Sequence, residues 1–308
     1  MHIPDGFVSV PVAAATTIAS VAGLGIALVR SKDAFGVRRA PVLGLTTAFI
    51  FAAQMINFPV AGGTSGHLLG GALAAIVLGS PWAGALCIAT VLIIQAVLFA
   101  DGGITALGAN IFNMGFVGVW VGWLLTQTLH RLFGGSKSRL PLAAGIAGAV
   151  SVVAAAICAA IQLAISGTAN LAVVLPAMTG VHILIGIGEG LITGGVLAYL
   201  VQARPDLLPG NDEEQIRGWV VPVVTIVLIA GLLSLFASAW PDGLEKVAED
   251  TGFIDLAEQV RISVPTPFAD YTFNENEGIG TSIAGIIGSI VCFAVAWGIA
   301  QIVKPKNA

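Results

Sequence analysis

The sequence is poor in charged residues. Only 10% of its 308 residues are Asp, Glu, Lys or Arg, whereas 56% are hydrophobic. Soluble domains carry about a quarter charged residues, so these few charges cannot cover a water-facing surface. The chain also lacks a basic stripe that would neutralise nucleic-acid phosphates. The composition therefore predicts an integral membrane protein and argues against a nucleic-acid partner.

Several functional signatures are missing as well. Cys87, Cys158 and Cys292 lie far apart within apolar runs, which argues against a disulfide framework or a thiolate metal cluster. No Lys or Arg precedes Arg30, so the start lacks the basic region of a signal peptide, and we expect the N-terminus to remain in the mature protein. The sequence has no P-loop for ATP and neither the H-E-x-x-H nor the G-x-S-x-G pattern of hydrolases.

Long apolar runs are what the sequence does contain. A bilayer core about 30 Å thick needs roughly 20 apolar residues in a helix. Nine segments reach or approach that length, which predicts an all-α membrane protein with a seven-helix unit followed by two further transmembrane helices. The segments are 8–29, 41–58, 67–78, 82–100, 104–129, 140–165, 174–201, 219–239 and 281–303. The third is too short to span alone, so we expect a tilted or half-inserted helix within the bundle.

Basic residues indicate how these segments are oriented. If the N-terminus is outside and the segments alternate, eleven of the 13 basic residues fall in inner loops, and only Lys246 and Arg261 fall outside. Because inner loops are enriched in Lys and Arg, we expect a multi-pass protein of the cell membrane with its N-terminus outside and its C-terminus in the cytoplasm. The inner basic residues are Arg30, Lys32, Arg38, Arg39, Arg131, Lys137, Arg139, Arg204, Arg217, Lys304 and Lys306.

The chain divides after the seventh segment. Residues 1–204 form the first unit, and 205–218 form a polar, cytoplasmic linker with the acidic run 212–214. Residues 219–308 form a second unit of two helices around an outer loop, 240–280. This loop holds nine of the 17 acidic residues, so its composition indicates an acidic and exposed segment.

The second residue is a histidine, and that position has its own coordination chemistry. The amine of Met1, the backbone nitrogen of His2 and the His2 imidazole can close two adjacent chelate rings on one metal ion. Three nitrogens then lie in a plane, and a fourth would complete the square geometry typical of Ni(II) or Cu(II). The alternative is that His2 belongs to a frayed terminus.

His67 can supply the fourth nitrogen. It follows the glycine-rich stretch 59–66, which the orientation places on the same outer side as Met1. Glycines let the backbone approach a small ligand closely. A single histidine at a helix start is more often a cap or an interface residue, but two imidazoles and an amine on one membrane face favour a metal. We therefore assign Met1, His2 and His67 as metal ligands.

Two ionisable residues lie inside the seventh segment. His182 and Glu189 are seven positions apart and share one helix face. Burying a charge in a membrane is costly, so both are functional candidates, although an interhelical hydrogen bond explains them equally well. Four nitrogens are available without them, so we expect supporting or packing roles for His182, Glu189, Asn57 and Ser65. Other polar residues in the spans are expected to join helices through hydrogen bonds, namely Gln54, Gln95, Asn110 and Asn113.

Three stretches carry a resemblance to a known family. Residues 1–7 are M-H-I-P-D-G-F, residues 54–71 contain Q-M-I-N-F-P and G-G-T-S-G-H-L-L-G-G, and residues 188–190 are G-E-G. They resemble the CbiM/NikM family, the substrate-binding membrane subunits of energy-coupling-factor transporters for nickel and cobalt. The resemblance covers about residues 1–204. It implies a seven-helix subunit that binds the ion through the Met1 amine, the His2 amide and imidazole, and His67.

The second unit carries a resemblance of its own. Residues 241–245, P-D-G-L-E, open the acidic loop and are similar to the two-helix CbiN/NikN auxiliary subunit, here fused to the first unit. This similarity implies that the outer loop assists metal loading.

Taken together, these features predict a non-enzymatic subunit that captures Ni²⁺ or Co²⁺ from outside for an ATP-driven importer. The resemblance implies separate ATPase subunits and a coupling transmembrane subunit as partners, with membrane lipid around the helices. A rival interpretation is a membrane metalloenzyme built from His2, His67, His182 and Glu189, but nothing in the sequence holds a second substrate. A passive channel is a third possibility, disfavoured because so complete a chelate holds an ion too long for conduction.

Overall fold

A computed structural model of the chain describes residues 1–32, 40–210, 218–259, 266–273 and 278–303. Regular structure in these ranges is almost entirely helical. Six of the described helices are long and apolar enough to cross a membrane, and two shorter apolar helices, Ala40–Gln54 and Val220–Phe236, accompany them. The expected all-α membrane fold is therefore confirmed.

The first unit contains helices α1 to α8. They are α1 Val10–Arg30, α2 Ala40–Gln54, α3 Gly71–Leu78, α4 Pro81–Leu98, α5 Leu107–Asn110, α6 Val119–Leu132, α7 Leu140–Ile165 and α8 Leu171–Ala203, with the short 3-10 helix η3 Lys137–Arg139. A second short 3-10 helix, η4 Pro205–Leu207, follows in the linker. Between α5 and α6 the chain continues as a π-helix, η2 Ile111–Gly118. α4 is the most buried of the long helices, whereas α1 exposes most of its surface, as a helix against lipid does.

Small residues allow α7 and α8 to pack closely along their length. A Cβ atom on Gly186 would lie 2.7 Å from the carbonyl oxygen of Ala149, and one on Gly190 would lie 2.7 Å from that of Gly145. Any larger residue at either position would force the two backbones apart. The close packing of this helix pair holds the face of α8 that carries His182 and Glu189 against the rest of the first unit.

The structure corrects three of the predicted helices. The α-helix expected over 219–239 ends at Gly231 and is followed by a 3-10 helix that ends at Phe236. The other two corrections concern neighbouring segments. The helix expected over 41–58 ends at Gln54, and the one expected over 67–78 begins only at Gly71. Between them lies an antiparallel hairpin of β1 Phe58–Val60 and β2 Thr64–Gly66. Pro59 disfavours a helical conformation at the residue before it, and Gly62 and Gly63 adopt φ values of 89° and 77° in the turn. His67 therefore lies in the non-helical segment between β2 and α3 and not at a helix start, while α3 is as short as expected.

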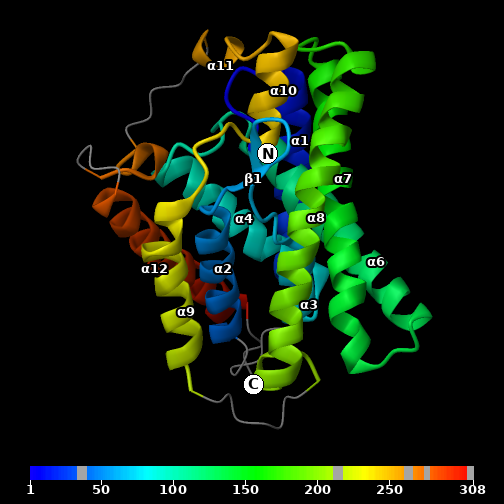
Figure 1. The fold of residues 1–308 in the computed structure, drawn as a ribbon, viewed down its shortest axis with the longest axis vertical. Helices are drawn as coiled ribbons and strands as arrows, with labels where there is room; N and C mark the ends of the chain where they lie inside the picture. Colours follow the sequence, from blue (N-terminus) through cyan, green and yellow to red (C-terminus); the bar gives the residue numbers. More distant parts are fainter. Residues whose placement is uncertain (33–39, 211–217, 260–265, 274–277, 304–308) are drawn as a thin grey trace.

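The second unit contributes two apolar helices and a folded segment between them. Its elements are α9 Val220–Gly231, η5 Leu233–Phe236, α10 Gly243–Thr251, α11 Leu256–Gln259, η6 Ala269–Tyr271 and α12 Ile279–Val303. α12 packs against α2 and α9. Figure 1 shows the N-terminus at the same end of the molecule as α10 and α11, with the end of α8 and the start of α9 at the opposite end.

Part of the charge pattern lies outside the described residues. This holds for the inner basic residues Arg38, Arg39, Arg217, Lys304 and Lys306, for Arg261, for the acidic run 212–214, and for Glu275 and Glu277.

Candidate metal-binding site

The N-terminal segment enters the protein instead of projecting from it. Met1, His2, Ile3 and Phe7 each expose 8% or less of their surface. Asn110 donates its Nδ2 hydrogen to the carbonyl oxygen of Ile3 at 3.0 Å and accepts the N–H of Ile3 at 2.8 Å. Asn110 therefore holds the N-terminal backbone as a neighbouring strand would. The role expected for it, a hydrogen bond between helices, is wrong, and a frayed terminus does not fit this arrangement.

Glycine lets the loop before α5 lie directly against the N-terminal segment. The N–H of Gly103 donates to the carbonyl oxygen of Ile3 at 2.9 Å. A Cβ atom on Gly103 would lie only 2.2 Å from the backbone nitrogen of Asp5, so a larger residue would displace the segment. Thr105 adds two hydrogen bonds to Asp5 Oδ1, from its N–H at 2.8 Å and from its hydroxyl at 2.5 Å.

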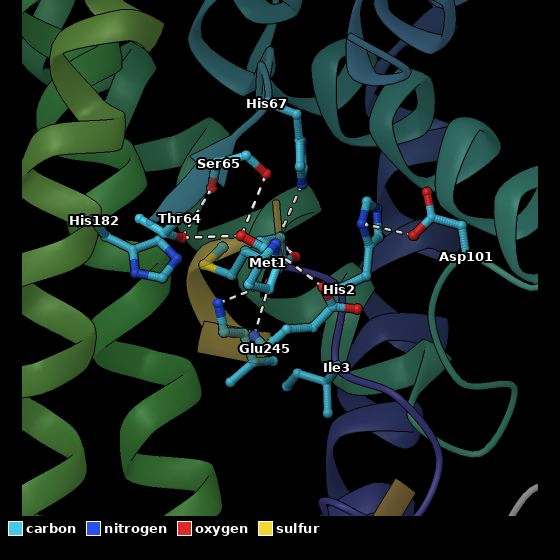
Figure 2. A network of polar contacts seen from close by, with 12 residues as sticks. Met1, His2, Ile3, Thr64, Ser65, His67, Asp101, His182 and Glu245 are labelled. Carbon is cyan, nitrogen blue, oxygen red and sulfur yellow. Dashed lines mark hydrogen bonds and ion pairs between the residues drawn. The ribbon is translucent and has the colours of Figure 1, made fainter. Parts of the chain in front are cut away.

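The Met1 amine lies between His67 and a carboxylate of the second unit. Its nitrogen is 3.0 Å from Nε2 of His67 and 2.5 Å from Oδ2 of Asp242. The Nδ1 of His67 is 2.9 Å from the carbonyl oxygen of Leu68. Because a carbonyl oxygen only accepts, Nδ1 carries the hydrogen and Nε2 presents its lone pair to the amine. Figure 2 shows this contact at the centre of the polar network.

The His2 ring stacks on the ring of His67. Their centroids are 5.0 Å apart and their planes differ by 17°. Nδ1 of His2 lies 3.1 Å from Oδ1 of Asp101, and Nε2 lies 3.2 Å from Oε1 of Gln95. Tyr271 of the second unit donates its hydroxyl to Asp101 Oδ2 at 2.5 Å and accepts Nε2–H of Gln95 at 3.1 Å. Gln95 thus contacts the N-terminal segment and the second unit, where the sequence analysis expected it to join helices.

Glu189 positions the segment that carries His67. Its carboxylate accepts the N–H groups of Leu69 at 2.5 Å and of Gly70 at 3.1 Å. These two groups precede α3, where backbone N–H donors have no partner within the helix. Gln54 adds a hydrogen bond from its Nε2 to the carbonyl oxygen of Leu69 at 3.0 Å. This geometry agrees with the supporting role expected for Glu189, and it occupies both oxygens of the carboxylate.

The other residues expected to support the site lie around it. Ser65, in β2, is fully buried and donates its hydroxyl to the carbonyl oxygen of Trp240 at 2.7 Å. Asn57 accepts the N–H of Ser238 through its backbone oxygen at 2.7 Å. His182, in α8, is 1% exposed and borders a small cavity beside Met1. The structure therefore gathers Met1, His2, His67, His182 and Glu189 at one place, as Figure 2 shows for the first four.

The second unit covers this place, contrary to the expectation of an exposed loop. The carbonyl oxygen of Pro241 accepts the N–H of Ser65 at 2.8 Å, so residues next to α10 run alongside β2. Asp242 caps α10 in a capping box with Glu245, and its side chain is only 13% exposed. Leu244 and Val247 are buried at 2% or less. α10 is amphipathic: its apolar face packs against the first unit, and its charged residues lie on the opposite, exposed face. This pattern explains why an acidic segment can fold onto the protein.

Asp101 and Asp242 contact the N-terminal residues, although neither was predicted from the sequence. Both were hidden because they contact Met1 and His2 only through the tertiary fold. One signal was available for Asp242, because it belongs to the P-D-G-L-E stretch that resembles a family motif. Asp101 directly follows the span predicted over 82–100. A carboxylate at the end of a membrane span is common, so its position gave no sign of a functional role.

Charge and burial set the protonation of the two histidines next to Met1. Burial, and then the Met1 ammonium and His2, lower the pKa of His67 to about 3. Burial also lowers the pKa of His2, although the nearby Asp101 opposes this shift. Both imidazoles therefore favour the neutral form, which is the form that binds a metal ion. Within the described ranges, no group of three or more His, Cys, Asp or Glu side chains forms a metal-binding cluster by side chains alone, without counting the Met1 amine.

Known proteins resemble both units. Residues 2–207 match the family model CbiM, described as the cobalt uptake substrate-specific transmembrane region, and residues 217–305 match the PDGLE domain. The putative fused nickel transport protein NikMN of Archaeoglobus fulgidus is 40% identical over 309 residues, which are 98% of each chain. The putative metal transport protein HQ_3621A of Haloquadratum walsbyi is 41% identical over 68% of this chain and 93% of its own.

A solved structure agrees with these relatives. A crystal structure of a transition metal transporter has 36% sequence identity and a TM-score of 0.60, and the match covers 70% of this chain and 96% of that one. The family match extends over more than half of the chain, and the relative from Archaeoglobus fulgidus is similar over both units. The chain therefore belongs to the CbiM family of cobalt-uptake substrate-specific transmembrane proteins, and a PDGLE domain follows the family region.

Proposed function

We propose that this chain is the substrate-specificity subunit of an energy-coupling-factor importer for Ni²⁺ or Co²⁺, and that its N-terminus holds the ion. The observation that carries the proposal is the 3.0 Å separation between the Met1 amine nitrogen and His67 Nε2. Two nitrogens bound at right angles to one ion, each at about 2.0–2.1 Å, lie about 2.9 Å apart. The spacing therefore suits two neighbouring ligands of the same ion.

His2 would complete the ligand set with its backbone nitrogen and its imidazole. Chelation through the backbone nitrogen uses Nδ1 of the ring, which lies 3.1 Å from Asp101. Ion binding therefore requires the ring to exchange this contact for the ion. Asp101 then remains beside the site as a negative charge. Together with Asp242 it offsets the charge of a divalent ion, whose burial without a counter-charge would be strongly unfavourable.

Transport requires chains beyond this one. The sequence lacks a P-loop, so we assign ATP hydrolysis to separate ATPase subunits and the transmission of its energy to a coupling membrane subunit. With the N-terminus outside, the site would face the side from which the ion arrives. The nickel and cobalt relatives support both ions as substrates, and a planar nitrogen set accepts Ni²⁺ readily.

The rival metalloenzyme has less support in this geometry. A catalytic metal usually needs a nearby general base, and Glu189 was the candidate. Both oxygens of Glu189 accept backbone N–H groups, so the carboxylate is engaged in holding the His67 segment.

Calorimetric titration of the full chain in lipid nanodiscs with Ni²⁺ and Co²⁺ tests the proposal. We expect binding of one ion per chain and its loss in His67→Ala. His130→Ala is the matched control, because His130 lies at the surface in α6 and bonds only locally, to Ser136. Equal ion binding by the His67→Ala variant and the parent chain would refute the proposed site.

A further inference from the structure

A small cavity lies on one side of the Met1–His67 pair. Its volume is about 10 Å³, which is room for a single water molecule or one ion. Four groups capable of binding a cation border it, and apolar side chains form the rest of the wall. The bordering residues are Met1, His67, His182 and Asp242 together with Gly66, Leu69, Val152, Ile185 and Gly243.

His182 presents a bare nitrogen at this cavity. The residue is 1% exposed, and its Nδ1 lies 2.8 Å from the carbonyl oxygen of Met178 in the preceding turn of α8. Because that oxygen only accepts, Nδ1 carries the hydrogen and Nε2 carries a lone pair. Among the described residues, nothing donates a hydrogen bond to this Nε2. A buried acceptor without a partner is rare in folded proteins, and a bound water molecule or ion is one way to satisfy it.

The same arrangement recurs at His67. There, too, Nδ1 donates to a backbone carbonyl oxygen, that of Leu68 at 2.9 Å, and Nε2 faces the Met1 amine. A hydrogen bond from one ring nitrogen fixes the tautomer and the orientation of a metal-binding imidazole. Both histidines are therefore held in the form that a transition-metal ion binds. They border the same cavity from different elements, β2 with its following segment and α8.

The two sides of the Met1 amine differ in character. Figure 2 shows His182 on one side of Met1 and Asp101, with which His2 pairs, on the other. The His2 side supplies the remaining nitrogens of the proposed chelate. On the His182 side, the Asp242 carboxylate lies 2.5 Å from the amine and adds negative charge beside the cavity. A cation in contact with Met1 and His67 would thus meet a nitrogen donor and a carboxylate there.

We propose that His182 supplies a further nitrogen donor to the transported ion, from the side of the Met1–His67 pair that faces α8. This inference rests on the proposed function, because it concerns the same ion. It assigns His182 more than the supporting role expected from the sequence. Imidazole nitrogen at this position favours nickel, cobalt, copper or zinc over magnesium or calcium, which prefer oxygen.

A cysteine at position 182 provides a direct test. The His182→Cys variant, loaded with Co²⁺ in nanodiscs, should show a thiolate-to-cobalt charge-transfer band in the near ultraviolet. The matched control is Leu184→Cys on the same helix, because Leu184 is 40% exposed on the outer surface. The control and the parent chain share the three native cysteines and should lack the band. A loaded His182→Cys variant without the band would overturn the inference.

A second variant covers the case in which His182→Cys does not fold. The His182→Gln variant keeps a polar side chain of similar size but offers no imidazole. The visible spectrum of its bound Co²⁺ should differ from that of the parent, because one nitrogen donor is missing. Loss of Co²⁺ binding with an unchanged melting temperature would also support the donor role. A packing role, or a water molecule in the cavity, would leave the spectrum of the bound ion unchanged and would refute the proposal.

The outcomes separate this inference from the function on which it rests. If the parent chain binds neither Co²⁺ nor Ni²⁺, both fail. If the parent and Leu184→Cys bind Co²⁺ with identical spectra, and both His182 variants match them, the inference on His182 alone fails.

Discussion

The Asp242 carboxylate lies 2.5 Å from the Met1 amine nitrogen, although 241 positions separate the two residues in the sequence. Burial is the largest single influence on Asp242 and would raise its pKa, but the Met1 ammonium, His67 and the hydrogen bonds that the carboxylate accepts together hold that pKa well below its ordinary value. The first residue of the chain is thus paired with the P-D-G-L-E stretch of the PDGLE domain. A ligand of the proposed site is therefore also an anchor for the second unit.

Asp242→Asn should loosen the attachment of the second unit. Removing one partner of a buried ion pair costs about 3–5 kcal/mol in well-buried cases, and the 13% exposure of Asp242 places it toward the lower end. Hydrogen exchange at residues 238–252 should become faster. Asp250→Asn is the control, since Asp250 forms only an exposed pair with Lys246 at 2.6 Å. Equal exchange in the two variants would contradict an anchoring role.

Adding one glycine before Met1 should abolish tight ion binding. The extension converts the Met1 amine into an amide, so this nitrogen can no longer coordinate as an amine. Loss of a residue that merely supports a ligand costs about 10–100-fold in affinity, so loss of the ligand itself should cost at least about 100-fold. Nickel titration of extended and unextended chains, each verified by mass spectrometry, gives the comparison. Equal affinities would exclude the amine as a ligand.

Glu189→Gln should weaken ion binding without removing a ligand. The substitution replaces one of the two oxygens that hold the N–H groups of Leu69 and Gly70, so the segment that carries His67 becomes less fixed. We expect a loss of about tenfold in affinity. Thr193→Val serves as control, because Thr193 contacts Glu189 only at 3.4 Å. A variant with the affinity of the parent would show that Glu189 does not position His67.

The proposed orientation places Lys32 inside and Asp250 outside. In a version without Cys87, Cys158 and Cys292, a cysteine introduced at Asp250 should react with an impermeant thiol reagent in intact cells. A cysteine introduced at Lys32 should react only after the cells are opened. Both residues are exposed, so a lack of reaction cannot be attributed to burial. Labelling of Lys32→Cys from outside would reverse the topology and place the site on the inner side.

Mild acid should destabilise the fold through His67. Its pKa in the folded chain is about 3, below the ordinary 6.5, so between these values the unfolded chain takes up a proton that the folded chain does not. The contribution of His67 to the free energy of unfolding is therefore at its full value above about pH 6.5. It decreases by up to about 1.4 kcal/mol per pH unit as the pH falls below that value. Thermal unfolding in nanodiscs from about pH 7 to about pH 4 measures this slope. His67→Gln should flatten it, and an unchanged slope would contradict the prediction.

Hydropathy was sufficient to predict the long helices, because a membrane span must satisfy its own backbone hydrogen bonds and exclude charge. It failed at the ends of α2 and α3. Residues 55–70 are apolar or glycine-rich, so composition alone makes them resemble a span. Their course is set by Pro59 and by Glu189. Glu189 lies in α8, 120 positions from Leu69 in the sequence, and its carboxylate accepts hydrogen bonds from the N–H groups that precede α3.

The proposed ligands Met1 and His2 were suggested by the sequence for a different reason. Met1 and His2 are neighbours in sequence, and their joint chelation depends only on covalent geometry. Asp101, Asp242 and Tyr271 reach the same place through packing between units, and no local pattern announces such contacts. The lone pair of His182 at the cavity was equally hidden, because it depends on a tautomer that the carbonyl group of Met178 selects.

The contact between Ser65 and residues 240–241 has the character of a complex between two proteins, formed here within one polypeptide. The occupancy of this contact then depends on an effective concentration set by the covalent connection between the units, which for tethered partners is on the order of millimolar. Even a weak intrinsic affinity would keep residues 240–241 of the second unit in contact with Ser65, whatever the expression level of the protein. Because both units belong to one polypeptide, each proposed ion site has one second unit beside it. The site therefore does not depend on the separate expression of a second chain.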